Sequence, residues 1–401
     1  MSIILAAQDA ALKDLNDLTD RGIRFHGTAG LESASHWLEE QLRAAGLAVT
    51  RQRVAVPGWA PGEVCRLRLT SPEEREIRAW PLLWSGSTGG ARRGRVVEMG
   101  PEGLWGDSMV WQKFLVLDEE GEILAYLIGR DSGRAAPQPL PSGSDYARAH
   151  FAIGREDADA LARSLAAGEE VSVELELDCV HGGVAASDNL IVDIPAAPDA
   201  AGEAWPEDRH VLLCAHYDTF WNTPGAYDNG SGTIALLRLA RTWAHHAPPR
   251  PVRLIFFTGE EWHLSGSREY LAQTSQHQRD AIAYVLNIDG LGRGEFVEAF
   301  AAPERFEVEF SLTTRAYAAA TRPGLRVVSR FPPTTGTDDA TFYRAGIPSG
   351  FMTLNDREHL HQPEDLPNPE IAQNIIWVEG LAAHLLETLA APARAAAPGI
   401  L

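Results

Sequence analysis

The chain has 401 residues, which exceeds the roughly 100–200 residues of one typical domain and favours two domains. Its formal net charge of −20 disfavours nucleic acid or an anionic membrane as a partner, because both are negatively charged themselves. The three cysteines are odd in number and far apart in the sequence, so neither a disulfide framework nor a CxxC metal site is expected.

No apolar stretch approaches the ~18 residues that a membrane-spanning helix needs. The N-terminal segment Met1–Ala7 lacks the basic residues that open a secretory signal peptide. We therefore expect no membrane association and a cytoplasmic location, with secretion as the alternative if a leader precedes this sequence.

The N-terminal part of the chain predicts two helices followed by a strand. A helix is expected over Glu32–Ala45, where the apolar residues follow helical spacing and Gly46 ends the helix. Leu47–Val56 alternates apolar and polar residues, which is typical of a half-buried strand. The proline- and glycine-rich segment Pro57–Gly62 is interpreted as a linker.

The pattern changes between this linker and about residue 170. Short strand-like runs are followed by a loop rich in Pro, Gly and Ser at Ala135–Ser144 and by a helix at Glu156–Ala167. The region holds several tryptophans but no cluster of histidines and acids. We expect a small α+β domain over residues 59–170 that shapes substrate access and carries no chemistry.

From about Glu170 onward, strand-like and helix-like segments alternate again. The expected segments are the strands Val171–Leu177, Leu190–Ile194, Val211–Ala215, Val252–Thr258 and Ala283–Ile288 and the helix Thr233–Ala244. Such alternation predicts an α/β domain, formed by residues 1–58 and 171–401, with a mostly parallel or mixed twisted sheet and helices on both faces. The tail Ala390–Leu401 is expected to be frayed.

Acids and histidines follow the ends of successive predicted strands. Those that follow the strands directly, or lie in the next turn, are His216, Asp218, Asp228, Glu260, Glu261 and Asp289. Open α/β sheets bind their ligands at this edge, and imidazole with carboxylate is a ligand set for zinc. A later loop adds His359 and His361.

Each of these residues alone has an ordinary explanation, such as a turn for Asp228, a helix N-terminus for Glu260 and Glu261, or a solvated loop for His361. Their joint occurrence indicates a two-metal hydrolase. In such a site a carboxylate bridges two ions that lie ~3.5–4 Å apart.

These motifs resemble those of the M28 family of zinc-dependent exopeptidases, in the branch with an inserted protease-associated (PA) domain. The segments that carry the resemblance are Leu213–Ala240, Val252–Tyr270, Asn287–Gly292 and Thr337–Leu366, and the insert resembles a PA domain more loosely. The resemblance implies a phosphorylase/hydrolase-like zinc exopeptidase fold. It also implies an aminopeptidase that acts on peptides with a free N-terminus, with carboxypeptidase and dipeptidase activity left open.

The resemblance further implies two zinc ions per chain, for which Co²⁺ or Mn²⁺ could substitute. The implied ligands are His216, Asp228 and Asp289 for one ion, and Asp228, Glu261 and His361 for the other, with Asp228 as the bridge. Asp218 would orient the ring of His216, and Glu260 would act as the general base on the attacking water. His359 is the alternative to His361.

The sequence departs from the family pattern at two positions. Leu360 stands where the family usually has a tyrosine that stabilises the oxyanion, and Asp339 stands where a histidine usually follows an acid, here Asp338. Asp338 is a candidate for orienting a ligand. Trp221 and Trp262 flank the motif residues and belong either to the core or to a pocket for a bulky N-terminal residue.

Two other functions remain open at this point. A glutaminyl-cyclase-like transferase would use the same fold with a single zinc ion, and the sequence around Asp228 disfavours it. A relative that kept the scaffold as a catalytically weak binding surface would have lost ligands, and this chain retains them all. The number of zinc ions per chain separates the first of these from the peptidase.

Overall fold

The computed structural model describes residues 2–105, 109–198, 205–206, 208–333 and 336–390. The chain divides into two compact units. Unit 1 consists of Met1–Ala55, Ala186–His359 and Pro363–Leu401, and unit 2 of Val56–Ala185 and Leu360–Gln362. The domain limits expected from the sequence, after residues 58 and 170, stay a prediction.

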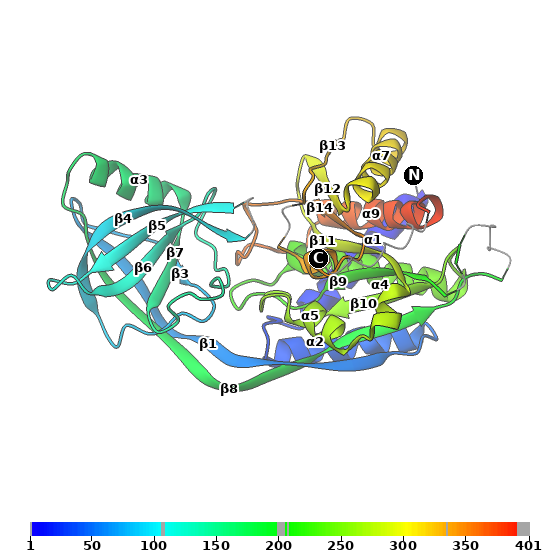
Figure 1. Ribbon diagram of the computed structural model, residues 1–401, viewed down its shortest axis with the longest axis horizontal. Helices are drawn as coiled ribbons and strands as arrows, with labels where there is room; N and C mark the ends of the chain where they lie inside the picture. Colours follow the sequence, from blue (N-terminus) through cyan, green and yellow to red (C-terminus); the bar gives the residue numbers. More distant parts are fainter. Residues whose placement is uncertain (1, 106–108, 199–204, 207, 334–335, 391–401) are drawn as a thin grey trace, which may run out of the picture. The chain divides into compact units, whose positions relative to one another are not determined.

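Unit 1 is built on a twisted mixed sheet (Figure 1). Its strands are, in spatial order, β13 (Arg326–Val328), β12 (Phe296–Ala302), β14 (Ser349–Leu354), β11 (Ile282–Leu291), β9 (His210–His216), β10 (Val252–Phe257) and the C-terminal part of β8 (Ser172–Ile194). The central strands β10, β9, β11 and β14 are parallel, whereas β8 and β12 run antiparallel to their neighbours β10 and β14. The predicted α/β class with a mixed sheet is confirmed.

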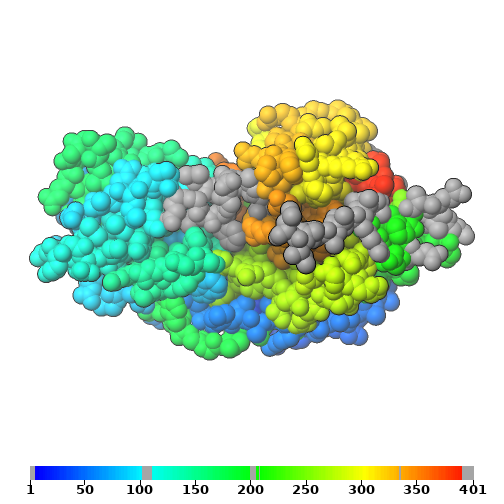
Figure 2. All heavy atoms as spheres, in the orientation of Figure 1, coloured from blue at the N-terminus to red at the C-terminus, as the bar shows by residue number. Residues whose placement is uncertain are grey.

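The helices of unit 1 pack against the sheet and each other. They are α1 (Ser2–Thr19), α2 (Ala29–Ala44), α4 (Ser231–His245), α5 (Ser265–Gln273), α6 (Gln276–Asp280), α7 (Glu304–Thr321), α8 (Asp338–Arg344) and α9 (Pro369–Thr388). Helix α9 contacts α1 and α4, and α5 contacts α8 (Figure 1). The residues of α7, yellow in Figure 2, lie at the surface of this unit.

The central strands are apolar at successive positions because both of their faces are buried. In β9, Leu212 and Cys214 pack in one cluster with Tyr270 of α5 and Phe342 of α8. Side chains alternate between the faces of a strand, so the other apolar residues of β9 face the opposite side of the sheet. The polar residues of β9 are the two histidines at its ends, His210 and His216, of which His216 is buried.

Unit 2 is β-rich with one helix. Its strands are β1 (Thr50–Ser71), β2 (Arg75–Glu76), β3 (Ala79–Pro81), β4 (Arg92–Trp105), β5 (Met109–Leu117), β6 (Ile123–Gly129), β7 (Ala149–Ile153) and the N-terminal part of β8, and its helix is α3 (Arg155–Ala166). A core of Leu82, Trp111, Ile128, Leu140 and Ala152 stabilises it. These strands and this helix agree with the α+β composition expected for the insert.

The interpretation of Pro57–Gly62 as a linker was wrong, because this segment lies inside β1. Gly58 packs against the backbone of Gly182 in β8, and a Cβ atom at Gly58 would lie only 2.3 Å from the Gly182 carbonyl oxygen. Glycine here permits close approach of two chain segments instead of marking a loop. Of the predicted frayed tail, residues 391–401 lie outside the described residues. Among the helices that the structure describes, none has an apolar stretch long enough to cross a membrane.

Candidate metal centre

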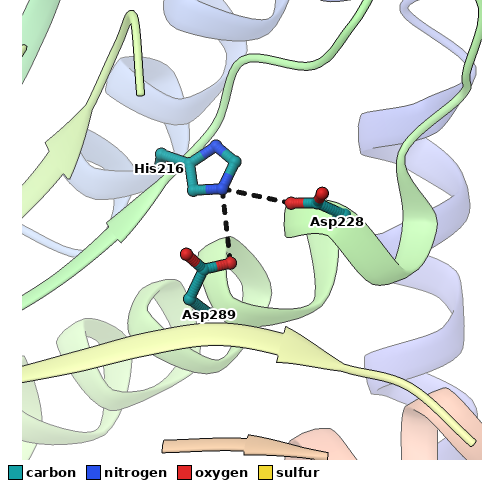
Figure 3. Close-up of side chains that lie close together, drawn as sticks. All are labelled: His216, Asp228 and Asp289. Atoms are coloured by element: carbon teal, nitrogen blue, oxygen red, sulfur yellow. Dashed lines mark ion pairs between the residues drawn. The ribbon is translucent and has the colours of Figure 1, made fainter. Parts of the chain in front are cut away.

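Three of the predicted ligands converge on one point (Figure 3). His216 ends β9, Asp228 lies in the turn between β9 and α4, and Asp289 lies near the end of β11. The Nε2 atom of His216 lies 3.2 Å from Asp228 Oδ1 and 3.3 Å from Asp289 Oδ1. The parallel arrangement of β9 and β11 brings these strand ends together, as the sequence indicates.

The distances between the ligand atoms of these three residues match those around a bound metal ion. Two atoms that each bind a tetrahedral zinc ion at about 2.0–2.1 Å lie about 3.3 Å from one another. One imidazole nitrogen and two carboxylate oxygens of this trio lie within 4.8 Å of one another, and all three side chains are buried. The donor atoms and their spacing therefore fit a divalent cation such as zinc.

Asp218 fixes the surroundings of His216 through the backbone. Its carboxylate accepts hydrogen bonds from the backbone N–H of Glu260 (3.2 Å) and of Glu261 (3.3 Å). The Nδ1 atom of His216 lies 3.2 Å from the Asp218 carbonyl oxygen and 3.5 Å from its carboxylate. Donation from Nδ1 to either oxygen leaves the Nε2 lone pair directed at Asp228 and Asp289.

Glu260 and Glu261 follow β10 and are both buried. The Oε2 atom of Glu260 lies 4.0 Å from His216 Nε2, which places this carboxylate beside the trio without joining it. The next residue, Trp262, is fully buried, and its ring centroid lies 5.4 Å from that of Phe25. The rings of Trp221 and Phe25 are 5.3 Å apart, so both tryptophans contact the same aromatic side chain.

Buried carboxylates give this region an excess of negative charge. Burial alone would lower the pKa of His216, but the charges of Asp289 and Glu260 outweigh it and raise that pKa well above its usual value. Burial raises the pKa of Glu260 well above its usual value and also raises the pKa of Asp289. Because buried acids of like charge are costly without a counter-charge, a divalent cation would stabilise the cluster and displace protons from it.

His361 belongs to unit 2 and is held there by the loop predicted at Ala135–Ser144. Its Nδ1 lies 2.7 Å from the Pro137 carbonyl oxygen and 3.0 Å from Gln138 Nε2. Its neighbour Gln362 donates to the Ala135 carbonyl oxygen at 2.8 Å. Donation from Nδ1 to Pro137 leaves the Nε2 lone pair for a metal. The second predicted ligand set thus draws on both units, and it stays a prediction.

His359, the alternative ligand, belongs to unit 1 and is engaged elsewhere. Its Nδ1 lies 2.8 Å from Asp356 Oδ1, and Asp356 also accepts a hydrogen bond from Arg293 Nε at 2.6 Å. These hydrogen bonds and charges lower the pKa of Asp356 despite its partial burial. This contact turns the imidazole towards Asp356, and His359 belongs to neither group of candidate metal ligands among the described residues.

Asp338 and Asp339 open helix α8 and are both buried. Burial raises the pKa of Asp338 to about 7, against the opposing charge of His216. Asp339 accepts hydrogen bonds from Asn287 Nδ2 (3.4 Å) and from Thr337. Asp339 therefore connects the start of α8 to β11.

Sequence reasoning missed a buried arginine, Arg24, that donates to backbone carbonyl oxygens around the trio. Its acceptors lie 193–201 residues away and carry no side-chain signal. Asp365 lies in the segment Thr337–Leu366 that carries the resemblance, but no role was predicted for it. Its carboxylate accepts hydrogen bonds from the backbone N–H of Tyr227 and Asp228, and its place four residues after His361 was the signal for a role near the trio.

Residues 189–382 match the model of peptidase family M28. The fold is similar to that of an aminopeptidase from Aneurinibacillus sp. strain AM-1, with a TM-score of 0.70 at 18% identity over 96% of each chain. It is also similar to BSAP, a zinc aminopeptidase from Bacillus subtilis, with a TM-score of 0.63 at 19% identity over 94% of each chain. These likenesses confirm the predicted α/β fold with a twisted mixed sheet and helices.

A vacuolar membrane protease of Arthroderma gypseum is 31% identical over 197 residues, which are 44% of this chain and 19% of that protein. The chain spans about a fifth of the length of such relatives. Their vacuolar membrane names contradict the expected cytoplasmic location, which was wrong. That expectation rested on finding neither a signal peptide nor a membrane-spanning stretch, and such an absence is no evidence for a compartment.

Proposed function

We propose that the chain is a zinc-dependent peptidase of the M28 type and acts as an aminopeptidase with two metal ions. The observation that carries this proposal is the trio of His216, Asp228 and Asp289, whose ligand atoms have the spacing of a zinc site inside a buried cluster of acids. The match to the M28 family model over residues 189–382 supports it, because that segment contains the trio.

In this proposal the trio holds one ion, and Asp228, Glu261 and His361 hold the second, so that Asp228 serves both. When bound, zinc polarises the scissile carbonyl and lowers the pKa of a water molecule from 15.7 towards about 7. Asp218 keeps the ring of His216 in the tautomer that presents Nε2. The site for the first ion needs only the trio, whereas the site for the second ion also needs His361.

Glu260 moves the proton in this proposal. It lies beside the trio, and burial together with the charge of Glu261 raises its pKa, while His216 opposes that shift. A carboxylate whose pKa is raised accepts a proton from the attacking water and returns it to the leaving amine near neutral pH. Glu260 therefore performs both proton transfers of peptide hydrolysis.

The charge of the site favours an aminopeptidase. The acids of the proposed site outnumber its two histidines, and carboxylate oxygens that two bound ions leave unshared would be available to a further cation. The free α-ammonium group of a peptide supplies that cation at the residue next to the scissile bond. An endopeptidase substrate carries no charge there, so the electrostatic preference is for the N-terminus.

We also propose that residues 59–170 form a PA-like domain that controls the access of peptides. Its support is the composition of the segment and a core of its own around Trp111. Rates on short and long peptides would be compared between the intact chain and a chain lacking the segment. Identical specificity in both would refute a role in access.

The experiment that tests the proposed function is hydrolysis of a panel of aminoacyl-anilides with and without a metal chelator. We expect hydrolysis that the chelator abolishes and that added zinc restores. N-acetylated versions of the same anilides serve as the control, because they lack the ammonium group and should not be cleaved. Chelator-insensitive hydrolysis would contradict the metal mechanism, and equal cleavage of the acetylated substrates would contradict the aminopeptidase assignment.

A further inference from the structure

Two buried charged residues hold the chain segment that joins two of the proposed ligands. This segment begins after His216 at the end of β9 and reaches Asp228 in the turn before α4. Arg24 approaches it from the N-terminal part of the chain, and Asp365 from the part that precedes α9. Both have no solvent exposure, so their charges are directed at the protein.

Arg24 connects the two ends of the segment through its guanidinium group. Nε donates to the Tyr217 carbonyl oxygen at 2.6 Å, Nη1 to that of Pro224 at 2.7 Å and Nη2 to that of Gly225 at 2.8 Å. The first acceptor directly follows one proposed ligand, and the other two shortly precede the next. Because the guanidinium is planar with fixed donor directions, it sets the separation of these carbonyls.

The backbone of Arg24 strengthens this connection. Its N–H donates to Thr219 Oγ1 at 3.1 Å, and its carbonyl oxygen accepts from the Thr219 N–H at 3.1 Å. Gly225 has a φ of 63°, and a Cβ atom there would lie 2.2 Å from Thr219 Cγ2 and 3.1 Å from Arg24 Nη2. Only glycine fits between these two side chains, so the turn is closely matched to the arginine.

Asp365 binds the backbone N–H groups of the same turn. Its Oδ1 accepts from the N–H of Tyr227 at 2.8 Å and its Oδ2 from the N–H of Asp228 at 3.1 Å. Its carbonyl oxygen also accepts from the N–H of Ala226 at 3.3 Å. The cation of Arg24 therefore binds the carbonyls of the turn, and the carboxylate of Asp365 binds its amides, which fixes the peptide planes leading to Asp228.

We propose that Arg24 and Asp365 are positioning residues that fix the separation of His216 and Asp228 and thereby set the affinity of the site for a divalent cation. The proposal rests on the proposed function, since it requires a cation between these ligands. Groups that orient metal ligands typically change metal affinity by about 10–100-fold when they are altered. A purely structural pair would change the stability of the fold and leave the intrinsic metal affinity unaltered.

The test compares Arg24→Lys with Arg209→Lys. Arg209 is also buried, and its Nη2 donates to the carbonyl oxygens of Ile282 (3.2 Å) and Ala283 (3.1 Å). These acceptors lie at the start of β11, about 20 Å along the strand from Asp289. Lysine keeps the charge in both variants but cannot span several carbonyls. Zinc affinity is measured by competition with a chromophoric chelator, and folding by circular dichroism and thermal unfolding.

We expect Arg24→Lys to weaken zinc binding by about 10–100-fold, and Arg209→Lys to leave it unchanged at a similar loss of thermal stability. Wild-type zinc affinity in folded Arg24→Lys would overturn the inference. If that variant fails to fold, Asp365→Asn makes the same comparison, because it places an amide NH₂ or a weaker acceptor at the Tyr227 and Asp228 amides. A wild-type chain that binds no zinc would instead refute the proposed function itself.

Discussion

Replacing Glu260 by glutamine should abolish catalysis and leave the metal site intact. The Oε2 atom of Glu260 lies 4.0 Å from His216 Nε2, and Glu260 belongs to neither group of candidate metal ligands among the described residues. A general base contributes about 10²–10⁴-fold to the rate, so kcat should fall by that factor. KM should change little, because the amide occupies the same volume.

The assay is the steady-state hydrolysis of an aminoacyl-anilide by enzyme whose zinc content is determined on the same sample. Glu307→Gln is the matched control, because Glu307 is buried in α7 but lies outside the cluster of acids. Burial raises the pKa of Glu260, so a neutral amide should not destabilise the fold. Activity within tenfold of wild type, or loss of zinc from Glu260→Gln, would refute the assignment of this residue as the base.

Three further predictions concern the acids, the histidines and the metal. In the metal-free chain, Asp338 has a pKa of about 7 against an ordinary 3.8, so its contribution to stability is present below pH 3.8 and lost as the pH rises through about 7. Thermal unfolding between pH 4 and 8 should therefore show a fall in stability of a few kcal/mol that Asp338→Asn reduces, and an unchanged slope would contradict this. His361→Ala should lose one zinc ion by elemental analysis, whereas His359→Ala should retain both; the opposite result would exchange the two roles. Removal of zinc from the wild type should lower its melting temperature, because a ligand that binds only the folded state stabilises it; an unaltered melting temperature would argue against a site in the folded chain.

Much of the fold follows from sequence patterns because the buried strands are apolar throughout. The runs around Val211–Ala215 and Val252–Thr258 have the composition of strands covered on both faces, and the structure has β9 and β10 there. The prediction of a linker at Pro57–Gly62 failed because proline and glycine are typical of loops. In this chain they serve the close approach of Gly58 to Gly182, which is a tertiary contact that no local pattern records.

The trio could be predicted for the same reason, since parallel strands bring their carboxyl ends to one edge. Arg24 could not, because it binds backbone carbonyls, and every residue has a backbone carbonyl whatever its type. The role of Asp365 could not be predicted either, because its carboxylate oxygens accept hydrogen bonds from backbone N–H groups of a turn. The conformation of that turn depends on Gly225 and on Arg24. Side chains that act on other side chains leave a pattern of residue types, and side chains that act on the backbone do not.

The number of zinc ions per chain, measured by elemental analysis while zinc is titrated into the metal-free protein, tests the two-metal proposal most directly. We predict that aminopeptidase activity rises until two equivalents of zinc are bound and then stays constant. Full aminopeptidase activity with one bound equivalent would contradict the bridging role of Asp228, and one bound equivalent without aminopeptidase activity would favour a single-zinc transferase. A chain that binds no zinc would contradict the metal site as a whole.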